Sequence, residues 1–326
     1  MILQIISEAE RGRLMKEYLA KRILQAFAVV LCISAITFFV LNIVPGDPVR
    51  IMMGDMADDQ TVEQVRHNMG LDRPVPEQYA NWLVKLAHGD FGKSYTQNKP
   101  VMVLLAKAIS VTLKLSGAAY LVALVVGVVV GVLAAVYHGR FLDRFLMSVA
   151  ICGISAPSFW VAIIVQIIFA LHLHLFPLSG VKTAAAFVLP TFALSTRYAA
   201  SIARVTRTAM LEVLGQDFMR TAASKGLSEH AIILVHGLRN AMIPIITIAG
   251  TQLGDIFCGS LIIESVFAMP GMGKLLLDAI NARDLPLIEG AVMYIAIICV
   301  GVYLLVDILY ALIDPRIRLG NGGESA

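Results

Sequence analysis

Hydrophobic residues are gathered into long runs along this chain, and most polar residues lie between those runs. Six of the runs reach the roughly 20 residues that an α-helix needs to cross a bilayer. The pattern therefore predicts an all-α, polytopic membrane protein with six transmembrane helices. The predicted spans cover residues 23–44, 111–136, 145–170, 184–203, 241–263 and 290–313.

Composition supports a membrane protein and excludes several other classes. Hydrophobic residues make up 58% of the chain and charged residues only 15%, whereas soluble domains carry about 25% charged residues. The net charge of +3 is too small to indicate a nucleic-acid partner. The cysteines lie in apolar runs without CxxC spacing, so we expect no disulfide framework, no metal site and no cofactor. They are Cys32, Cys152, Cys258 and Cys299.

The runs divide the chain into segments. The first run is longer than the apolar part of a signal peptide and lacks a cleavage site after it, so we expect it to be retained. Residues 1–22 precede it, and their first 16 residues are either an amphipathic helix or an extension before a true start at Met15. Residues 45–110 form a polar outer segment that is too short for a catalytic domain. Residues 111–313 hold the other spans, and residues 314–326 form a tail.

The distribution of basic residues predicts the orientation of the chain. Fourteen Lys and Arg residues lie in the N-terminal segment, the 137–144 turn, the 204–240 loop and the tail. The short loops on the opposite side hold three. Because short cytoplasmic loops are enriched in Lys and Arg, we expect both termini in the cytoplasm and residues 45–110 in the periplasm.

The cytoplasmic loop over residues 204–240 carries the strongest functional signal. It reads as a helix of good helix formers that is broken at Gly226 and followed by a second helix through Leu238. A helix–glycine–helix element at a membrane face offers a projecting contact for a soluble partner.

This loop resembles the EAA coupling loop of ABC importer permeases, in the form found in the dipeptide/oligopeptide/nickel family. The Arg-Thr-Ala-x-x-x-Gly stretch from Arg220 to Gly226 matches that form, although the Glu, first Ala, Ile and Pro of the general pattern are absent. Further matches to the family lie along residues 19–319. They are Pro45-Gly46-Asp47-Pro48, Gly70-Leu71-Asp72, Gly89-Asp90-Phe91-Gly92, Pro270-Gly271-x-Gly273, Val306-Asp307 and Asp314-Pro315-Arg316.

The resemblance implies a type I ABC importer permease fold and a transport cycle. A second, distinct permease would complete a heterodimer in the lipid bilayer of the inner membrane. Two cytoplasmic ATP-binding subunits would each grip one coupling loop, and a periplasmic binding protein would deliver the substrate. The residues implied to contact the ATPase are Arg220, Thr221, Ala222, Ala223, Gly226 and Leu227.

The chain itself is not expected to be an enzyme, because it lacks the Gly-x4-Gly-Lys-Ser/Thr pattern that cradles nucleotide phosphates. A peptide is the expected substrate. Nickel, a metal chelate or an opine is the alternative for the same machine, and a stand-alone secondary transporter or channel is an alternative of another class. Secondary transporters often contain internal repeats, and no convincing repeat relates residues 20–170 to residues 184–313.

Two charged residues lie inside predicted spans, where a charge costs about 3 kcal/mol or more unless it faces a polar path or a partner. Arg197 and Asp255 therefore either line the translocation path or pair with each other inside the bundle, or the Arg197 side chain extends toward the cytoplasm. Gly127 and Gly131 form a Gly-x3-Gly pair, which we expect to bring two helices of this chain close together.

Overall fold

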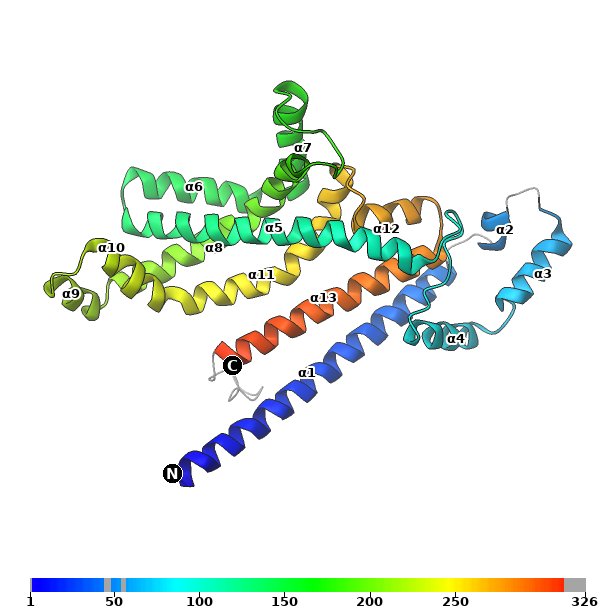
Figure 1. Ribbon diagram of the computed structural model, residues 1–326, viewed down its shortest axis with the longest axis horizontal. Coiled ribbons are helices and arrows are strands. Elements are labelled where there is room, and N and C mark those ends of the chain that lie inside the picture. Colours follow the sequence, from blue (N-terminus) through cyan, green and yellow to red (C-terminus); the bar gives the residue numbers. More distant parts are fainter. Residues whose placement is uncertain (1, 44–47, 54–56, 314–326) are drawn as a thin grey trace. The chain divides into compact units, whose positions relative to one another are not determined.

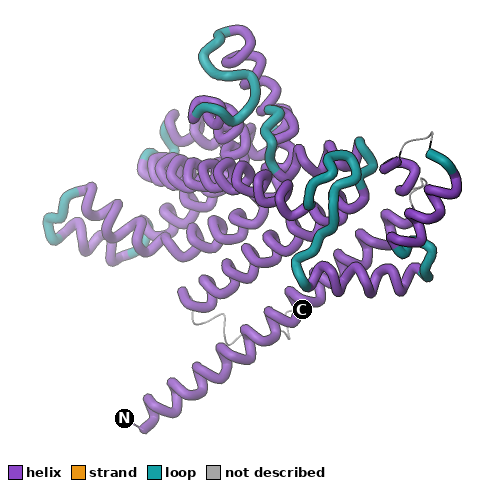
Figure 2. The backbone as a smooth tube through the Cα atoms, turned by 45° about the vertical axis from the view of Figure 1, so that its right-hand side comes forward, coloured by secondary structure: helices purple, strands orange, loops and turns teal. Residues whose placement is uncertain are grey.

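The computed structural model describes residues 2–43, 48–53 and 57–313, which form two compact units. Within those ranges the elements are helices joined by turns and loops, with one isolated β-bridge between Lys93 and Pro100 (Figure 2). The all-α prediction is confirmed. The motifs predicted at residues 45–47 and 314–316 lie outside the described residues.

The first unit comprises residues 1–110 and 271–326. Within it α1 and α13 pack lengthwise against each other (Figure 1), and an ion pair of 3.3 Å joins Arg22 to Asp307. The helices of this unit are α1 (Ile2–Ile43), α2 (Pro48–Met53), α3 (Asp59–Met69), α4 (Val75–Ala87), the first turns of α5 (Val101–Val136), α12 (Met272–Asn281) and α13 (Leu285–Ile313).

Helix α4 of the outer segment is fixed to α1 by aromatic packing. The Phe38 ring lies 5.3 Å from the Tyr79 ring and 5.7 Å from the Trp82 ring, measured between centroids. Ser34 and the Tyr79 hydroxyl share a hydrogen bond of 2.8 Å. Aromatic pairs of this kind contribute more to stability than the apolar area they bury, so these contacts hold α4 against the end of α1.

The second unit comprises residues 111–270, and α8 lies at its centre with α6, α7 and α11 packed around it. Its core includes Leu115, Leu194, Ile256 and Ile263, all fully buried. The elements of this unit are the remainder of α5, α6 (Phe141–Ser155), α7 (Ser158–Val165), the π-helix η1 (Gln166–His172), the 3-10 helix η2 (Ala184–Phe187), α8 (Val188–Leu214), α9 (Asp217–Ser224), α10 (Glu229–Ala231), the π-helix η3 (Ile232–Leu238) and α11 (Arg239–Val266).

Two glycines let α5 approach α8 closely. A β-carbon at Gly127 would lie 2.7 Å from the Ile202 Cβ, and one at Gly131 would lie 2.5 Å from the Thr206 Cβ. Real β-carbons do not come this near to other atoms, so larger residues at either position would push the helices apart. The predicted role of this Gly-x3-Gly pair in packing within the chain is confirmed.

The predicted count of six spans is not confirmed. In the described part of the chain, four helical stretches are long and apolar enough to cross a membrane. A fifth is present if α6 and the α7–η1 stretch, which are bent by 107°, count as one span. Helix α8 falls short because Arg197 and Arg204 lower its hydropathy. The four stretches are Leu19–Ile43, Val101–Val136, Glu229–Val266 and Leu285–Ile308.

The span predicted over residues 145–170 corresponds to two helical stretches that are bent by 107° at the break that contains Pro157. Helix α6 ends at Ser155, and Pro157 adopts an extended conformation with φ −60° and ψ 134° before α7 starts. Proline lacks the N–H that would continue the helical hydrogen bonds. The predicted 204–240 loop also differs, because α8 continues through its first part to Leu214 and η3 runs directly into α11.

Candidate functional site

The predicted coupling segment contains a short separate helix, α9, which follows α8 after a brief turn. Gln216 is extended, with φ −82° and ψ 152°, and Asp217 places an acidic group in the first turn, where the helix dipole favours it. At the far end, Gly226 has φ +78°, a conformation that glycine adopts readily. The Gly226 N–H donates to the Ala223 carbonyl at 3.0 Å, so the chain leaves α9 through a sharp turn.

One face of α9 is buried and holds the helix in place. Met219 is 4% exposed and Ala222 is 8% exposed. A β-carbon at Gly237 would lie 3.2 Å from the Met210 Cε and 3.6 Å from the Met219 Cε, so α9, α8 and η3 meet at this glycine. The structure thus places Ala222 differently from the other predicted contact residues, because its side chain packs inward and is not available to a partner.

The opposite face of α9 and the turn after it are exposed. This exposed surface presents a cation at Arg220 and an apolar side chain at Leu227, which is 42% exposed. The nearest carboxylate to Arg220 is that of Asp217 at 3.9 Å, and both side chains are more than 80% exposed, so this pair contributes little to stability. The predicted residues on this surface are Arg220, Thr221, Ala223, Gly226 and Leu227.

After the turn, the chain returns through α10 and the π-helix η3. Ser228 caps this return, because its Oγ accepts a hydrogen bond of 3.4 Å from the Ala231 N–H. π-helices are rare and are often found at functional sites, and η3 lies between α10 and α11. The sequence predicted an ordinary helix here, because the apolar pattern does not distinguish the two windings.

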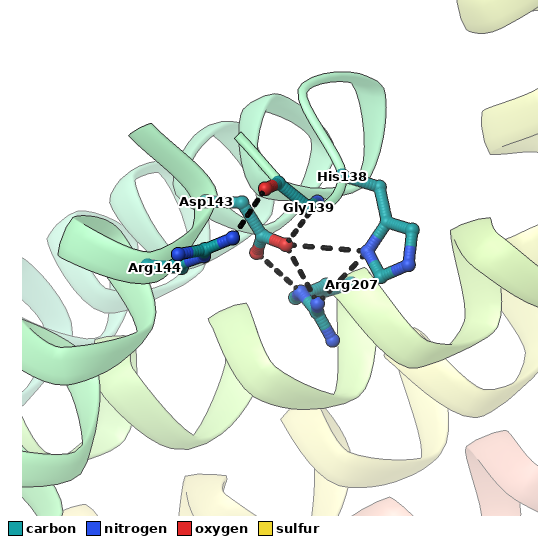
Figure 3. A network of polar contacts seen from close by, with 5 residues as sticks. All are labelled: His138, Gly139, Asp143, Arg144 and Arg207. Atoms are coloured by element: carbon teal, nitrogen blue, oxygen red, sulfur yellow. Dashed lines mark hydrogen bonds and ion pairs between the residues drawn. The ribbon is translucent and has the colours of Figure 1, made fainter. Parts of the chain in front are cut away.

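A buried ion pair joins α8 to the first turn of α6, next to the α5–α6 turn (Figure 3). Arg207 approaches Asp143 with two nitrogens: Nε donates to Oδ1 at 2.6 Å, and Nη2 donates to Oδ2 at 2.8 Å. The Gly139 N–H donates to the same Oδ2 at 3.0 Å, and the His138 Nδ1 lies 3.2 Å from it. The Asp143 side chain is 4% exposed. We refer to Asp143 and Arg207, with His138 and Gly139, as the α6–α8 clamp.

Sequence reasoning missed the α6–α8 clamp. Its two charges are 64 positions apart, and each looks like an ordinary charge at a membrane border. One available signal was the acidic residue four positions after Gly139, since a carboxylate at the start of a largely apolar run needs a partner when it is buried.

The two predicted path residues lie on neighbouring helices without forming an ion pair with each other among the described residues. Asp255 on α11 and Arg197 on α8 are both exposed in the single chain. Tyr198 connects the two helices, because its hydroxyl donates to the Asp255 carbonyl at 2.9 Å. Asp255 continues a stripe of exposed small polar side chains along α11, formed by Thr247, Thr251, Asp255 and Cys258.

In the first unit, a loop of the outer segment binds the carboxylate of Asp284 at the start of α13. Ser94 and Thr96 donate through their hydroxyls at 2.5 and 2.7 Å, and the N–H groups of Tyr95 and Thr96 each donate at 3.1 Å. Burial alone would raise the pKa of Asp284, but these hydrogen bonds outweigh burial, and the pKa lies below its usual value. Burial, with the charges of Glu289 and Asp284, raises the pKa of Tyr95 to about 12.

The same unit contains an open cavity of about 1350 Å³ between α1, α3, α4 and the start of α13. Its lining carries charges of both signs, from Arg66, Lys85 and Lys93 and from Asp90 and Glu289. Such a lining suits a polar ligand or a protein surface in water. Nowhere in the described chain do three side chains capable of binding a metal gather together.

Known proteins resemble the chain over nearly its whole length. Residues 127–319 match the binding-protein-dependent transport system inner membrane component, and residues 15–116 match the N-terminal part of the same systems. A protein of Brucella melitensis biotype 1 named as a peptide transport system permease is 38% identical over 94% of this chain and 99% of its own length. The glutathione transport system permease protein GsiC of Escherichia coli strain K12 is 38% identical over 93% of this chain and 99% of its own length.

A solved structure of the MetNI methionine ABC transporter, in an inward facing conformation, shares the fold. Its TM-score is 0.52 at 21% identity, and the match covers 67% of this chain and 96% of that one. Permeases of this family span the inner membrane several times, act with a binding protein, and leave ATP hydrolysis to separate ATPase subunits. The chain therefore belongs to the binding-protein-dependent transport system inner membrane components, as a permease subunit of an ABC importer.

Proposed function

We propose that this chain is one of two related but distinct permeases that together line the path of a bacterial peptide importer, with one ATPase subunit bound to the coupling helix of each. The observation that carries the proposal is the division of α9 into a buried face and an exposed face. The buried Met219 and Ala222 fasten the helix to the body of the permease. The exposed Arg220, Thr221 and Leu227 remain available to a soluble subunit.

The proposed cargo is a peptide, with glutathione-like peptides included. Relatives at 38% identity are named for peptide and for glutathione transport, which supports a peptide over nickel, a metal chelate or an opine. Competition between labelled di- and tripeptides and nickel in an uptake assay tests this choice. Uptake that nickel inhibits and peptides do not would contradict it.

We place both termini and α9 in the cytoplasm and the 45–110 segment in the periplasm. The excess of Lys and Arg in the short loops on the side of α9 supports this orientation. It also brings the exposed surface of α9 to the compartment that contains ATP. The large open cavity of the outer segment then faces the periplasmic binding protein.

Arg197 and Asp255 are proposed to face the translocation path. A charged side chain in a membrane helix is tolerated where it meets water or an opposite charge. The exposed polar stripe that contains Asp255 on α11 supports such a wet surface, which the second permease would cover. Arg197 would then meet the carboxylate of a passing peptide.

The coupling role of α9 is tested by Gly226→Pro in the complete complex with the ATPases and the binding protein. Proline is restricted to φ near −65° and cannot adopt the +78° of Gly226, and it lacks the N–H that bonds to Ala223. We expect stimulation of ATP hydrolysis by the loaded binding protein to collapse while the chain still inserts into the membrane.

The matched control is Gly89→Pro, at an outer glycine with φ +76° whose N–H also donates to the carbonyl three residues earlier. It makes the same backbone change in the segment that we place in the periplasm, away from the proposed ATPase contact. We therefore expect it to preserve basal ATP hydrolysis and assembly with the ATPase. If Gly226→Pro leaves stimulated hydrolysis and uptake unchanged, α9 does not transmit the ATPase movement, and the proposed mechanism is wrong.

A further inference from the structure

The α6–α8 clamp lies at a mechanically important place in the second unit. Helix α8 ends at Leu214, and Arg207 lies two helical turns before that end. Helix α9 follows directly, so a force applied to α9 enters the permease through the last turns of α8. The clamp is the ion pair that ties those turns to a neighbouring element.

The geometry of the clamp makes it stiff. The planar guanidinium of Arg207 meets both carboxylate oxygens of Asp143, an arrangement that fixes orientation as well as distance. The Asp143 side chain is nearly fully buried. Separating it from Arg207 would leave a buried carboxylate without its cation, which is costly, so the pair resists separation.

The turn between α5 and α6 is itself folded around the same carboxylate. Gly139 has φ +75°, which points its N–H toward Asp143, and its carbonyl accepts a hydrogen bond of 3.2 Å from the Arg144 Nη2. The Arg207 Nη2 also lies 3.0 Å from the His138 Nδ1. As Figure 3 shows, the turn meets the side of α8 through these polar groups.

We propose that Asp143 and Arg207 are positioning residues of transport, which make α9, the end of α8 and the α5–α6 turn move as one body when an ATPase moves α9. Without the clamp, only the packing of α8 against α5 and α6 opposes bending of its last turns, and less of the displacement of α9 reaches those helices. This inference rests on the proposed function of α9 and adds the route by which its movement enters the membrane.

The first test measures substrate taken up per ATP hydrolysed by the reconstituted complex with its ATPases and binding protein. Arg207→Gln removes the charge and the two-pronged contact, and we expect this ratio to fall by about fivefold or more, the lower end of the range for coupling between distant sites. Arg204→Gln is the matched control, because Arg204 is an exposed arginine one turn earlier on α8. It should retain the wild-type ratio.

The second test measures motion directly in the complete complex. Spin labels are placed at Arg140, in the α5–α6 turn, and at Ser224, at the end of α9, after the four cysteines are replaced by alanine. With the clamp intact, the distance between the labels should stay the same with and without ATP. In Arg207→Gln it should change or broaden when ATP binds, an effect that loss of stability alone does not produce.

The outcomes separate this inference from the proposed function. If Gly226→Pro uncouples the complex but Arg207→Gln keeps the wild-type ratio, the clamp proposal is wrong and the coupling role of α9 stands. A label distance that changes on ATP binding while the clamp is intact also overturns the clamp proposal, and this measurement decides even if Arg207→Gln fails to assemble. If Gly226→Pro has no effect, the coupling role of α9 itself is wrong.

Discussion

Neighbouring residues of α9 differ in what they can do, and only the structure separates them. Ala222 is 8% exposed, whereas Ala223 beside it is exposed. The sequence motif names both as contact residues, because a motif records which residue types recur and not the direction in which each side chain points. The face of α9 that is buried depends on Met210 and Gly237, and neither belongs to the motif.

This contrast predicts different effects for the same substitution at the two alanines. Ala222→Glu would bury a carboxylate without a partner, which is costly, so we expect α9 to undock and trypsin to cleave at Arg220 or Lys225 about tenfold faster or more, as for an opening free energy lower by about 1.4 kcal/mol. Ala223→Glu should leave the cleavage rate unchanged and weaken ATPase binding. Equal cleavage rates in the two variants would show that Ala222 is not a packing residue.

A second residue-scale prediction concerns pH and the Asp284 site. The pKa of Asp284 in the folded protein lies below its ordinary value, so the stabilisation that it supplies is fully present above about pH 4, the unfolded value for aspartate, and is lost as pH falls through the lowered pKa. The protection of the Tyr95 and Thr96 amides against hydrogen exchange should therefore be lost only as pH falls below about 4.

Asp284→Asn should make exchange at Tyr95 and Thr96 fast at neutral pH, because the amide carries no charge and fits the donors poorly. Asp278→Asn is the control, since Asp278 is an exposed acid on α12 that pairs with Lys274. Slow exchange at these amides in Asp284→Asn would show that the carboxylate does not hold the loop.

Among the elements, the sequence predicted well those whose apolar runs are long and uninterrupted. Helices α1, α5, α11 and α13 are of this kind. It predicted α8 poorly, because that helix carries arginines and continues eleven residues beyond the predicted end at residue 203. Pro157 marks a break in the sequence, but the angle of 107° depends on how the neighbouring helices pack.

The seam between α5 and α8 provides an element-scale prediction. Gly131→Ala would place a methyl group 2.6 Å from the Ala203 carbonyl, and overpacking of this kind destabilises by about 1–3 kcal/mol. We expect a lower Tm in detergent. Gly117→Ala, in the same helix but with nothing within 4 Å, should raise the Tm slightly, because alanine favours the helix by up to about 1 kcal/mol. A Tm for Gly131→Ala at or above wild type would contradict the close approach.

For the whole molecule, sequence reasoning identified the class and proposed a coupling segment, but it did not find the contacts that join distant positions. The Asp143–Arg207 pair spans 64 positions, and the Ser94–Asp284 contact spans 190. Local patterns contain no information about such pairs. The same reasoning left open whether Arg197 and Asp255 pair with each other, because facing helices cannot be assigned from hydropathy alone.

The native cysteines test the proposed path across the whole molecule. Cys32, Cys152 and Cys258 are all exposed in the single chain, but only Cys258 shares the polar stripe with Asp255. In the assembled complex, we expect a charged, water-soluble thiol reagent to label Cys258 much faster than the other two, because lipid excludes the reagent and suppresses the reactive thiolate. Single-cysteine variants provide the three rates. Labelling of Cys258 as slow as that of Cys152 would remove α11 from the path.

The contact between Ser94 and Asp284 also has a consequence for biosynthesis. Because the two residues are 190 positions apart, a ribosome adding about 5–20 residues per second needs roughly 10–40 seconds to proceed from one to the other. During that interval the donors of the outer loop have no carboxylate to bind and must be satisfied by water or by another protein. The outer segment therefore completes its fold only after the start of the last long helix has been made, so a chain truncated before Asp284 would leave the loop that contains Ser94 open to proteases.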